Sequence, residues 1–119
     1  MKKIAFVFSY VPHGVSLGRE GLDLLLSVSI MNSKISVFFI GDGIFQLLKN
    51  QKPDEILSKN YVLSFKILPF FGIYDFFLCN ESLKERGLFK KTDFLLDVSI
   101  LSAIEIRNKL KNSDLIINF

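Results

Sequence analysis

The segment that decides the fold is Ile35-Ser36-Val37-Phe38-Phe39-Ile40, which is followed at once by Gly41-Asp42-Gly43. Its residues are β-branched or aromatic almost throughout. A short, continuous apolar run that ends in a turn signal is typical of a strand buried on both faces. Such strands occur mainly in parallel sheets, whose neighbouring strands are joined by helical crossovers. The segment therefore predicts an α/β fold.

Four further segments predict strands of the same sheet, at residues 4–8, 76–79, 94–98 and 115–117. Between the first two strands, Leu22, Leu25 and Leu26 recur with the spacing of an amphipathic helix that begins near Arg19. Shorter helices are predicted near 45–48, from Pro53, and over 64–71, 82–87 and 102–110. This alternation predicts an α/β single-domain layered fold over residues 1–119, with a mostly parallel five-stranded sheet flanked by helices.

Composition and charge argue against several classes of protein. The formal net charge is +3 and the basic residues are scattered, which gives no indication of nucleic-acid binding. The one cysteine excludes an intrachain disulfide and fits a reducing compartment. No apolar run approaches the roughly 18 residues of a membrane-spanning helix. The apolar N-terminal stretch stops at Ser9, too early for a signal peptide. We therefore expect a cytoplasmic protein.

Two loops after predicted strands hold candidate polar residues, because ligands of α/β proteins bind beyond the carboxyl ends of the strands. The loop 9–18 contains the only histidine, His13, and its glycines do not match a phosphate-binding motif. Asp42, in the loop 41–43, either meets a cation or caps the following helix, and capping is the more frequent use. A small-ligand module built on these two loops is the least favoured reading. One histidine and one cysteine give little basis for a zinc site.

Cys79 closes the strand predicted at 76–79 and precedes Asn80-Glu81-Ser82, where a helix is expected to begin. The positive end of a helix dipole favours the thiolate that nucleophilic or persulfide chemistry requires. A nearby Glu81 opposes this effect, because one negative charge disfavours a second. A single cysteine at a strand end is also frequently a buried, small apolar residue. Both readings of Cys79, reactive and structural, stay open.

Phenylalanine is concentrated in one part of the chain. The sequence holds 13 phenylalanines and no tryptophan, and several large apolar residues crowd into 65–77. A segment this short cannot direct all of these large apolar side chains into the core. Because exposed apolar surface on a monomer is a liability, this segment predicts a contact with a partner protein.

Three blocks of sequence resemble the DsrF-like family of sulfur relay proteins, which belongs to the DsrE/DsrF-like superfamily. The first block is Lys3-Ile4-Ala5-Phe6-Val7-Phe8-Ser9 with Pro12-His13-Gly14 and Gly18-Arg19-Glu20-Gly21-Leu22-Asp23. The second is Val37-Phe38-Phe39-Ile40-Gly41-Asp42-Gly43-Ile44-Phe45-Gln46-Leu47-Leu48 with Gln51-Lys52-Pro53-Asp54, and the third is Ser82-Leu83-Lys84-Glu85-Arg86-Gly87-Leu88. The resemblance implies a small α/β fold with a mostly parallel sheet.

The resemblance also implies a function and partners. Proteins of this kind join TusB and TusD in a heterohexamer with two copies of each subunit. The complex takes sulfur from TusA and passes it through TusE to the enzyme that forms 5-methylaminomethyl-2-thiouridine at tRNA wobble positions. Because the sulfur travels as a cysteine persulfide, neither a metal nor an organic cofactor is implied. No direct tRNA binding and no membrane association are expected.

For Cys79 the resemblance leaves two roles. This residue aligns with the sulfur-bearing cysteine of the sister subunit TusD. The family nevertheless assigns the relay step to TusD, which implies a structural subunit without catalytic activity of its own. The alternative is a persulfide carrier in its own right through Cys79.

Overall fold

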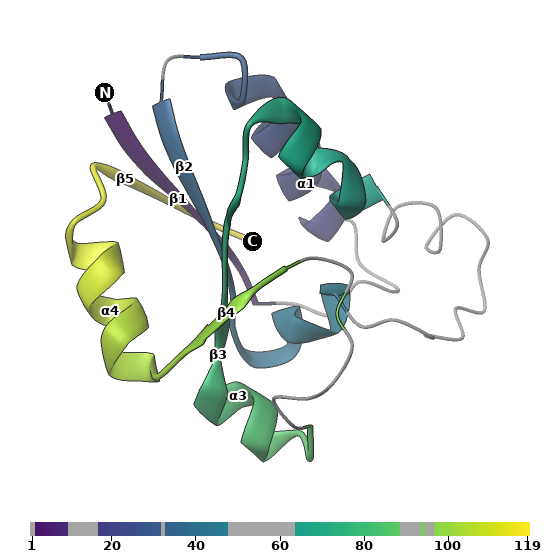
Figure 1. Ribbon diagram of the computed structural model, residues 1–119, viewed down its shortest axis with the longest axis vertical. Helices are drawn as coiled ribbons and strands as arrows, with labels where there is room; N and C mark the ends of the chain where they lie inside the picture. Colours follow the sequence, from purple (N-terminus) through teal and green to yellow (C-terminus); the bar gives the residue numbers. More distant parts are fainter. Residues whose placement is uncertain (1, 10–16, 32, 48–63, 89–93, 95–96) are drawn as a thin grey trace.

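The structure is a computed structural model that describes residues 2–9, 17–31, 33–47, 64–88, 94 and 97–119. Five strands form one sheet in the order β4-β3-β2-β1-β5, and every neighbouring pair is parallel (Figure 1). The strands are β1 (Lys2–Phe8), β2 (Ser33–Phe39), β3 (Asp75–Cys79), β4 (Ser99–Leu101) and β5 (Leu115–Asn118). The predicted fold class, an α/β fold with a parallel five-stranded sheet, is confirmed.

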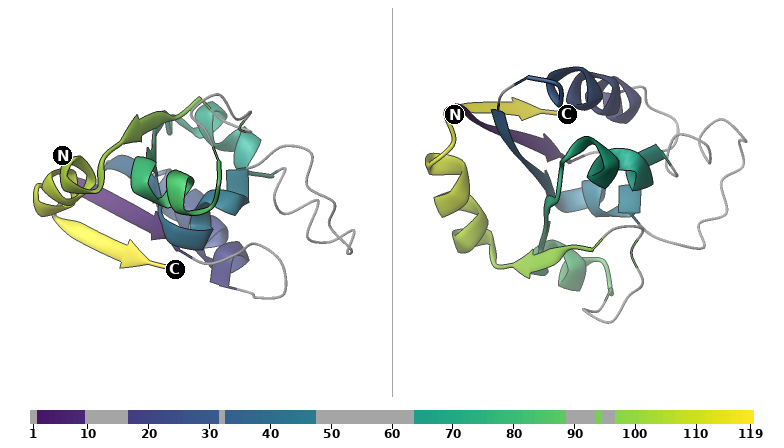
Figure 2. Two further views of the ribbon diagram at one scale, coloured as in Figure 1. Left: turned by 90° about the horizontal axis from the view of Figure 1, so that it is seen from below. Right: turned by 45° about the horizontal axis from the view of Figure 1, so that its top comes forward.

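Helices lie on both faces of this sheet. They are α1 (Leu17–Val28), the 3-10 helices η1 (Gly41–Leu47) and η2 (Ser64–Phe71), α3 (Asn80–Glu85) and α4 (Ala103–Lys111). The helices α1, η1 and η2 pack on one face, and α4 packs on the opposite face (Figure 2). Helical crossovers of this kind are what a parallel sheet requires.

The core has two unequal parts, because successive side chains of a strand point to opposite faces. On the α1 face, Phe6, Phe8 and Phe39 are fully buried, and the rings of Phe8 and Phe39 stack with their centroids 5.5 Å apart. The α4 face is smaller. Its buried residues are Ala5, Val7, Phe38, Cys79 and Ile106.

The ends of α3 and α4 follow from their sequences. Ser102 caps α4 by accepting the backbone N–H of Glu105, whose side chain in turn accepts the N–H of Ser102. This reciprocal pair is a capping box. At the end of α3, Gly87 has a φ of +68°, and its N–H bonds to the carbonyl of Lys84. A glycine in this conformation ends a helix without steric cost, so the predicted stop at Gly87 is confirmed.

One predicted strand is wrong. The sequence places a strand at 94–98, whereas the fourth strand of the sheet is β4, at Ser99–Leu101. Phe94 and Val98 are instead partly buried against the larger core cluster without forming a strand of that length. β4 lies at an edge of the sheet, where it pairs only with β3. It is three residues long.

The helix predictions differ from the structure in smaller ways. The helix predicted over 64–71 is the 3-10 helix η2, which contains Pro69. Proline lacks the N–H that a longer α-helix needs at this position. The helix predicted from Ser82 begins two residues earlier, at Asn80. The helical piece predicted from Pro53 lies outside the described residues.

Candidate functional site

Cys79 occupies the junction of β3 and α3 at the carboxyl edge of the sheet. It is the last residue of the strand and the N-cap of the helix, with an extended backbone at φ −79° and ψ 121°. Its side chain makes no capping hydrogen bond, and the residue is only 6% exposed. The thiol therefore lies in the smaller apolar cluster, as a small apolar residue would.

A hollow of about 320 Å³ opens beside Cys79, between the carboxyl edge of the sheet and α4. Most of its lining is aliphatic or backbone, and Arg107 of α4 is the charged residue of that lining. The lining residues are Ile40, Gly41, Cys79, Ser82, Ala103, Ile106, Arg107 and Leu110. The hollow thus has a mostly apolar lining that includes Cys79 and one positively charged residue, Arg107.

Glu81 makes its hydrogen bonds at the start of α4. Its two carboxylate oxygens accept the backbone N–H of Ala103, at 3.0 and 3.1 Å. Ala103 is the first residue of α4, so the carboxylate complements the positive end of that helix. The negative charge is therefore engaged at α4.

Ser82 joins two loops of the site, a role that the sequence analysis missed. Its buried hydroxyl accepts the backbone N–H of Gly41 at 2.8 Å. This bond fixes the start of η1 against α3. A serine three residues after Cys79 carries no local signal for such a contact, because its partner stands 41 residues away in the sequence.

Asp42 meets a cation, as one of its two sequence-based readings predicted, and that cation is the side chain of Arg86. The Nε atom of Arg86 donates to its Oδ1 at 2.9 Å. Arg86 also donates from Nη1 to the backbone carbonyl of Ser82 at 3.2 Å. The pair closes the loop 41–43 onto the C-terminal end of α3, so Asp42 supports the site from outside the hollow.

The other predicted site residues contribute less. His13 and most of the loop 9–18 lie outside the described residues. The hydroxyl of Ser9 donates to the carbonyl of Phe119 at 3.0 Å, which ties the end of β1 to the C-terminus. Within the described residues, no cluster of three or more histidine, cysteine, aspartate or glutamate side chains is arranged to hold a metal ion. Among the described helices, none is long and apolar enough to cross a bilayer.

The phenylalanine-rich segment 65–77 splits between core and surface. Leu68, Ile73 and Phe76 are buried. In contrast, Phe70 is 89% exposed and Tyr74 is 70% exposed, and Phe71 is also exposed. The large apolar residues Ile30 and Met31, just after α1, are also exposed. We call Phe70, Phe71 and Tyr74 the aromatic surface.

Comparison with known proteins identifies close relatives. The chain is 55% identical to Protein TusC of Buchnera aphidicola subsp. Acyrthosiphon pisum (strain 5A), and the match covers the full length of both proteins. It is 52% identical, again over both full lengths, to Protein TusC of Buchnera aphidicola subsp. Schizaphis graminum (strain Sg). The crystal structure of the ychN protein from E. coli shares the fold, with a TM-score of 0.80 and 23% identity over all of both chains. A sequence profile of the DsrE/DsrF-like family matches residues 2–119, and the chain belongs to this family.

Proposed function

We propose that this chain is a subunit of the sulfur relay that serves 2-thiolation of tRNA wobble uridine, and that its role there is structural. The similarity to TusC proteins over the full length of both chains supports the relay assignment. In this proposal residues 1–119 act as one domain in the cytoplasm. The chain joins TusB and TusD in a heterohexamer with two copies of each subunit, which receives sulfur from TusA and delivers it to TusE.

The observation that carries the structural role is the aromatic surface. Phe70, Phe71 and Tyr74 lie within five residues of one another and leave large apolar side chains in water. Aromatic residues are enriched at the centres of protein interfaces, where each contributes a large contact area. Exposed apolar groups gathered in one segment favour a surface that a partner subunit covers.

The burial of Cys79 supports the same role. Persulfide transfer requires that an attacking thiolate reach the sulfur atom. Cys79 is packed in the cluster that contains Ala5, Val7 and Ile106, and little of it is exposed. We therefore assign the persulfide-bearing step to TusD and the supporting step to this chain.

Co-purification tests the proposal directly. Tagged chain is co-expressed with TusB and TusD, in wild-type form and as the double variant Phe70→Ser/Tyr74→Ser. The matched control is Ile104→Ser, which alters an equally exposed apolar residue on the opposite face of the sheet. Wild type and control should recover both partners, whereas the double variant should lose them without a lower melting temperature.

Two results would count against the proposal. If the wild-type chain recovers neither partner, it is not a subunit of this complex. If the double variant assembles as well as wild type, the aromatic surface is not the contact.

A second candidate function, persulfide transfer through Cys79, is favoured by one observation. Cys79 lines the hollow of about 320 Å³ together with Arg107, so there is space beside the residue for a sulfur donor. In this reaction the Cys79 thiolate attacks the outer sulfur of a persulfide donor, a new S–S bond forms, and the donor leaves as a thiolate. Mass spectrometry of the assembled complex after exposure to sulfur-loaded TusA distinguishes the two functions. An added sulfur atom on Cys79 supports the carrier, and sulfur on TusD alone supports the structural subunit.

A further inference from the structure

The amino ends of β1 and β2 carry lysines side by side on the α4 face of the sheet. The parallel register pairs Lys3 with Lys34 and Ala5 with Ser36. Parallel sheets are usually covered by helices on both faces. The nine residues of α4 extend roughly 13 Å, whereas a seven-residue strand extends roughly 23 Å. Lys3 and Lys34 are exposed, so this end of the face is open to solvent.

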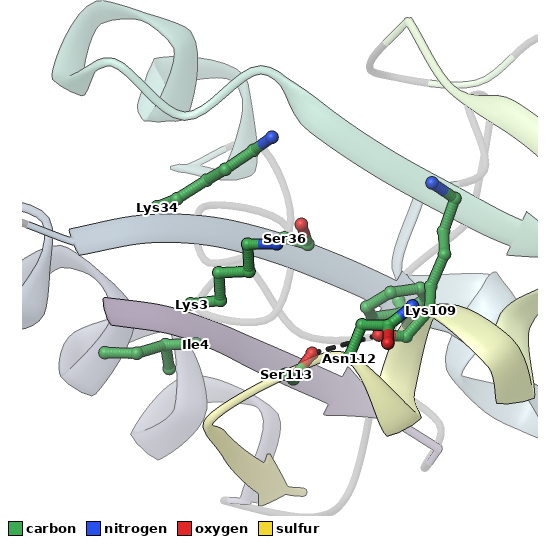
Figure 3. A pocket seen from close by; sticks show the side chains of 8 residues that line it. Lys3, Ile4, Lys34, Ser36, Lys109, Asn112 and Ser113 are labelled. Atoms are coloured by element: carbon green, nitrogen blue, oxygen red, sulfur yellow. Dashed lines mark hydrogen bonds between the residues drawn. The ribbon is translucent and has the colours of Figure 1, made fainter. Parts of the chain in front are cut away.

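A pocket of about 170 Å³ lies at this open end. Its floor is formed by β1 and β2, and its wall is the C-terminal end of α4 with the turn that follows (Figure 3). The residues that line it are Lys3, Ile4, Lys34, Ser36, Phe38, Lys109, Asn112 and Ser113. In Figure 3 the long side chains of Lys3, Lys34 and Lys109 all extend on the same side of the sheet. Three lysines and Ser36 thus line one small pocket.

The lysines of this pocket form no ion pair within the described part of the chain. No carboxylate in that part forms an ion pair with Lys3, Lys34 or Lys109. The carboxylate of Asp114 accepts the backbone N–H of Lys3 at 2.8 Å. Asp75 stands beside Ser36 on the neighbouring strand but does not line the pocket. Like charges in register repel one another, so the arrangement favours an added anion.

The end of α4 does not oppose an anion as strongly as a bare helix end would. Its last carbonyls are the negative pole of the helix dipole. The carbonyl of Lys109 accepts the N–H of Asn112 at 3.2 Å and the hydroxyl of Ser113 at 3.2 Å. The carbonyl of Leu110 accepts the N–H of Ser113 at 3.1 Å. The ammonium of Lys109 lies 4.9 Å from the centre of the Phe77 ring, which keeps its charge on this side of the sheet.

We propose that this pocket binds a phosphate group. Lysine binds phosphate as a point charge, and several lysines around one site suit an anion of more than one negative charge. The pocket, at about 170 Å³, has room for a small anion such as inorganic phosphate or pyrophosphate. The site is distinct from the Cys79 hollow and does not depend on the proposed relay function.

A titration tests this site on the full chain, in the assembly in which it purifies. Amide resonances are followed by NMR as phosphate or pyrophosphate is added at constant ionic strength, with chloride replaced as phosphate rises. We expect shifts at residues 2–4, 34–36 and 109–113. The double variant Lys3→Gln/Lys34→Gln should weaken binding at least tenfold. The matched control is Lys84→Gln, which removes one exposed charge on α3. It should change the affinity for phosphate less than twofold.

The same experiment identifies the source of the phosphate group. If tRNA displaces inorganic phosphate from these residues, the group belongs to a polynucleotide backbone. If tRNA has no effect while pyrophosphate competes, the ligand is a free phosphate compound. Equal affinity in wild type and the double variant, or shifts spread evenly over all lysines, would overturn the proposal.

Discussion

Both carboxylate oxygens of Glu81 lie within 3.1 Å of the backbone nitrogen of Ala103, which donates its N–H to them. This contact links the first turn of α3 to the first residue of α4. Both helices contribute to the hollow beside Cys79, α3 through Ser82 and α4 through Ala103, Ile106, Arg107 and Leu110. The residue that the sequence suggested as a modulator of the thiol therefore acts as a positioning residue for a wall of the hollow.

Replacing Glu81 should lower the stability of the fold slightly. Glu81→Ala removes an acceptor from an N–H at the start of α4 and a negative charge from the positive end of its dipole. We expect a loss of about 1 kcal/mol in the free energy of unfolding, measured by urea denaturation. Glu85→Ala is the matched control on the same helix, because Glu85 makes only a 3.4 Å contact with Arg86. Equal losses for the two variants would show that the contact with Ala103 contributes nothing.

Gly43 should tolerate no side chain. A Cβ atom at this position would overlap the backbone carbonyl of Phe8 and come within 2.9 Å of the nitrogen of Ser9. These are backbone atoms at the end of β1 and cannot rotate away. We expect Gly43→Ala to cost more than about 3 kcal/mol or to abolish folding, as followed by thermal unfolding.

Gly72→Ala separates this clash from a purely conformational effect. Gly72 has a φ of +82°, but a Cβ added there would meet nothing within 4 Å. Its replacement should therefore cost only about 1–2 kcal/mol, the strain of an L-residue in the left-handed region. A Gly43 variant as stable as the Gly72 variant would contradict the close approach of η1 to β1.

The ion pair of Asp42 and Arg86 should make a small and salt-dependent contribution. The side chains are 53% and 22% exposed, so solvent screens their attraction. A double-mutant cycle with Asp42→Asn and Arg86→Gln should give a coupling free energy of about 0.5 kcal/mol. In about 1 M salt the coupling should fall toward zero, because the screening length drops to roughly 3 Å. A coupling that salt leaves unchanged would argue against an electrostatic origin.

Sequence patterns predicted the central strands well because burial there fixes residue type on both faces. The buried parts of β1 and β2 are the apolar runs 4–8 and 37–39, and Ile106 and Leu110 of α4, four residues apart, do pack in one cluster. The fourth strand was misplaced because the apolar residues Phe94 and Val98 contribute to the core without forming that strand. β4, an edge strand of three residues, is too short to show a clear strand pattern in the sequence.

The two sites differ in how far they could be predicted. Cys79 was found because it ends a strand and starts a helix, which is a local property. The bond from Gly41 to Ser82, and the contact of Glu81 with Ala103, join residues that are distant in the sequence. The lysines of the phosphate pocket were interpreted as scattered surface charge. Only the register of β1 and β2 places Lys3 beside Lys34.

The central claim is that this chain supports the sulfur relay without carrying sulfur on Cys79. The most direct test measures 2-thiouridine in tRNA from a bacterial strain in which a Cys79→Ser variant replaces the native subunit. A parallel strain, in which the persulfide cysteine of TusD is replaced, is the positive control for loss of thiolation. We predict that Cys79→Ser retains thiolation within twofold of wild type, in an intact complex with TusB and TusD. Loss of thiolation in an intact complex, equal to that of the TusD variant, would contradict the claim.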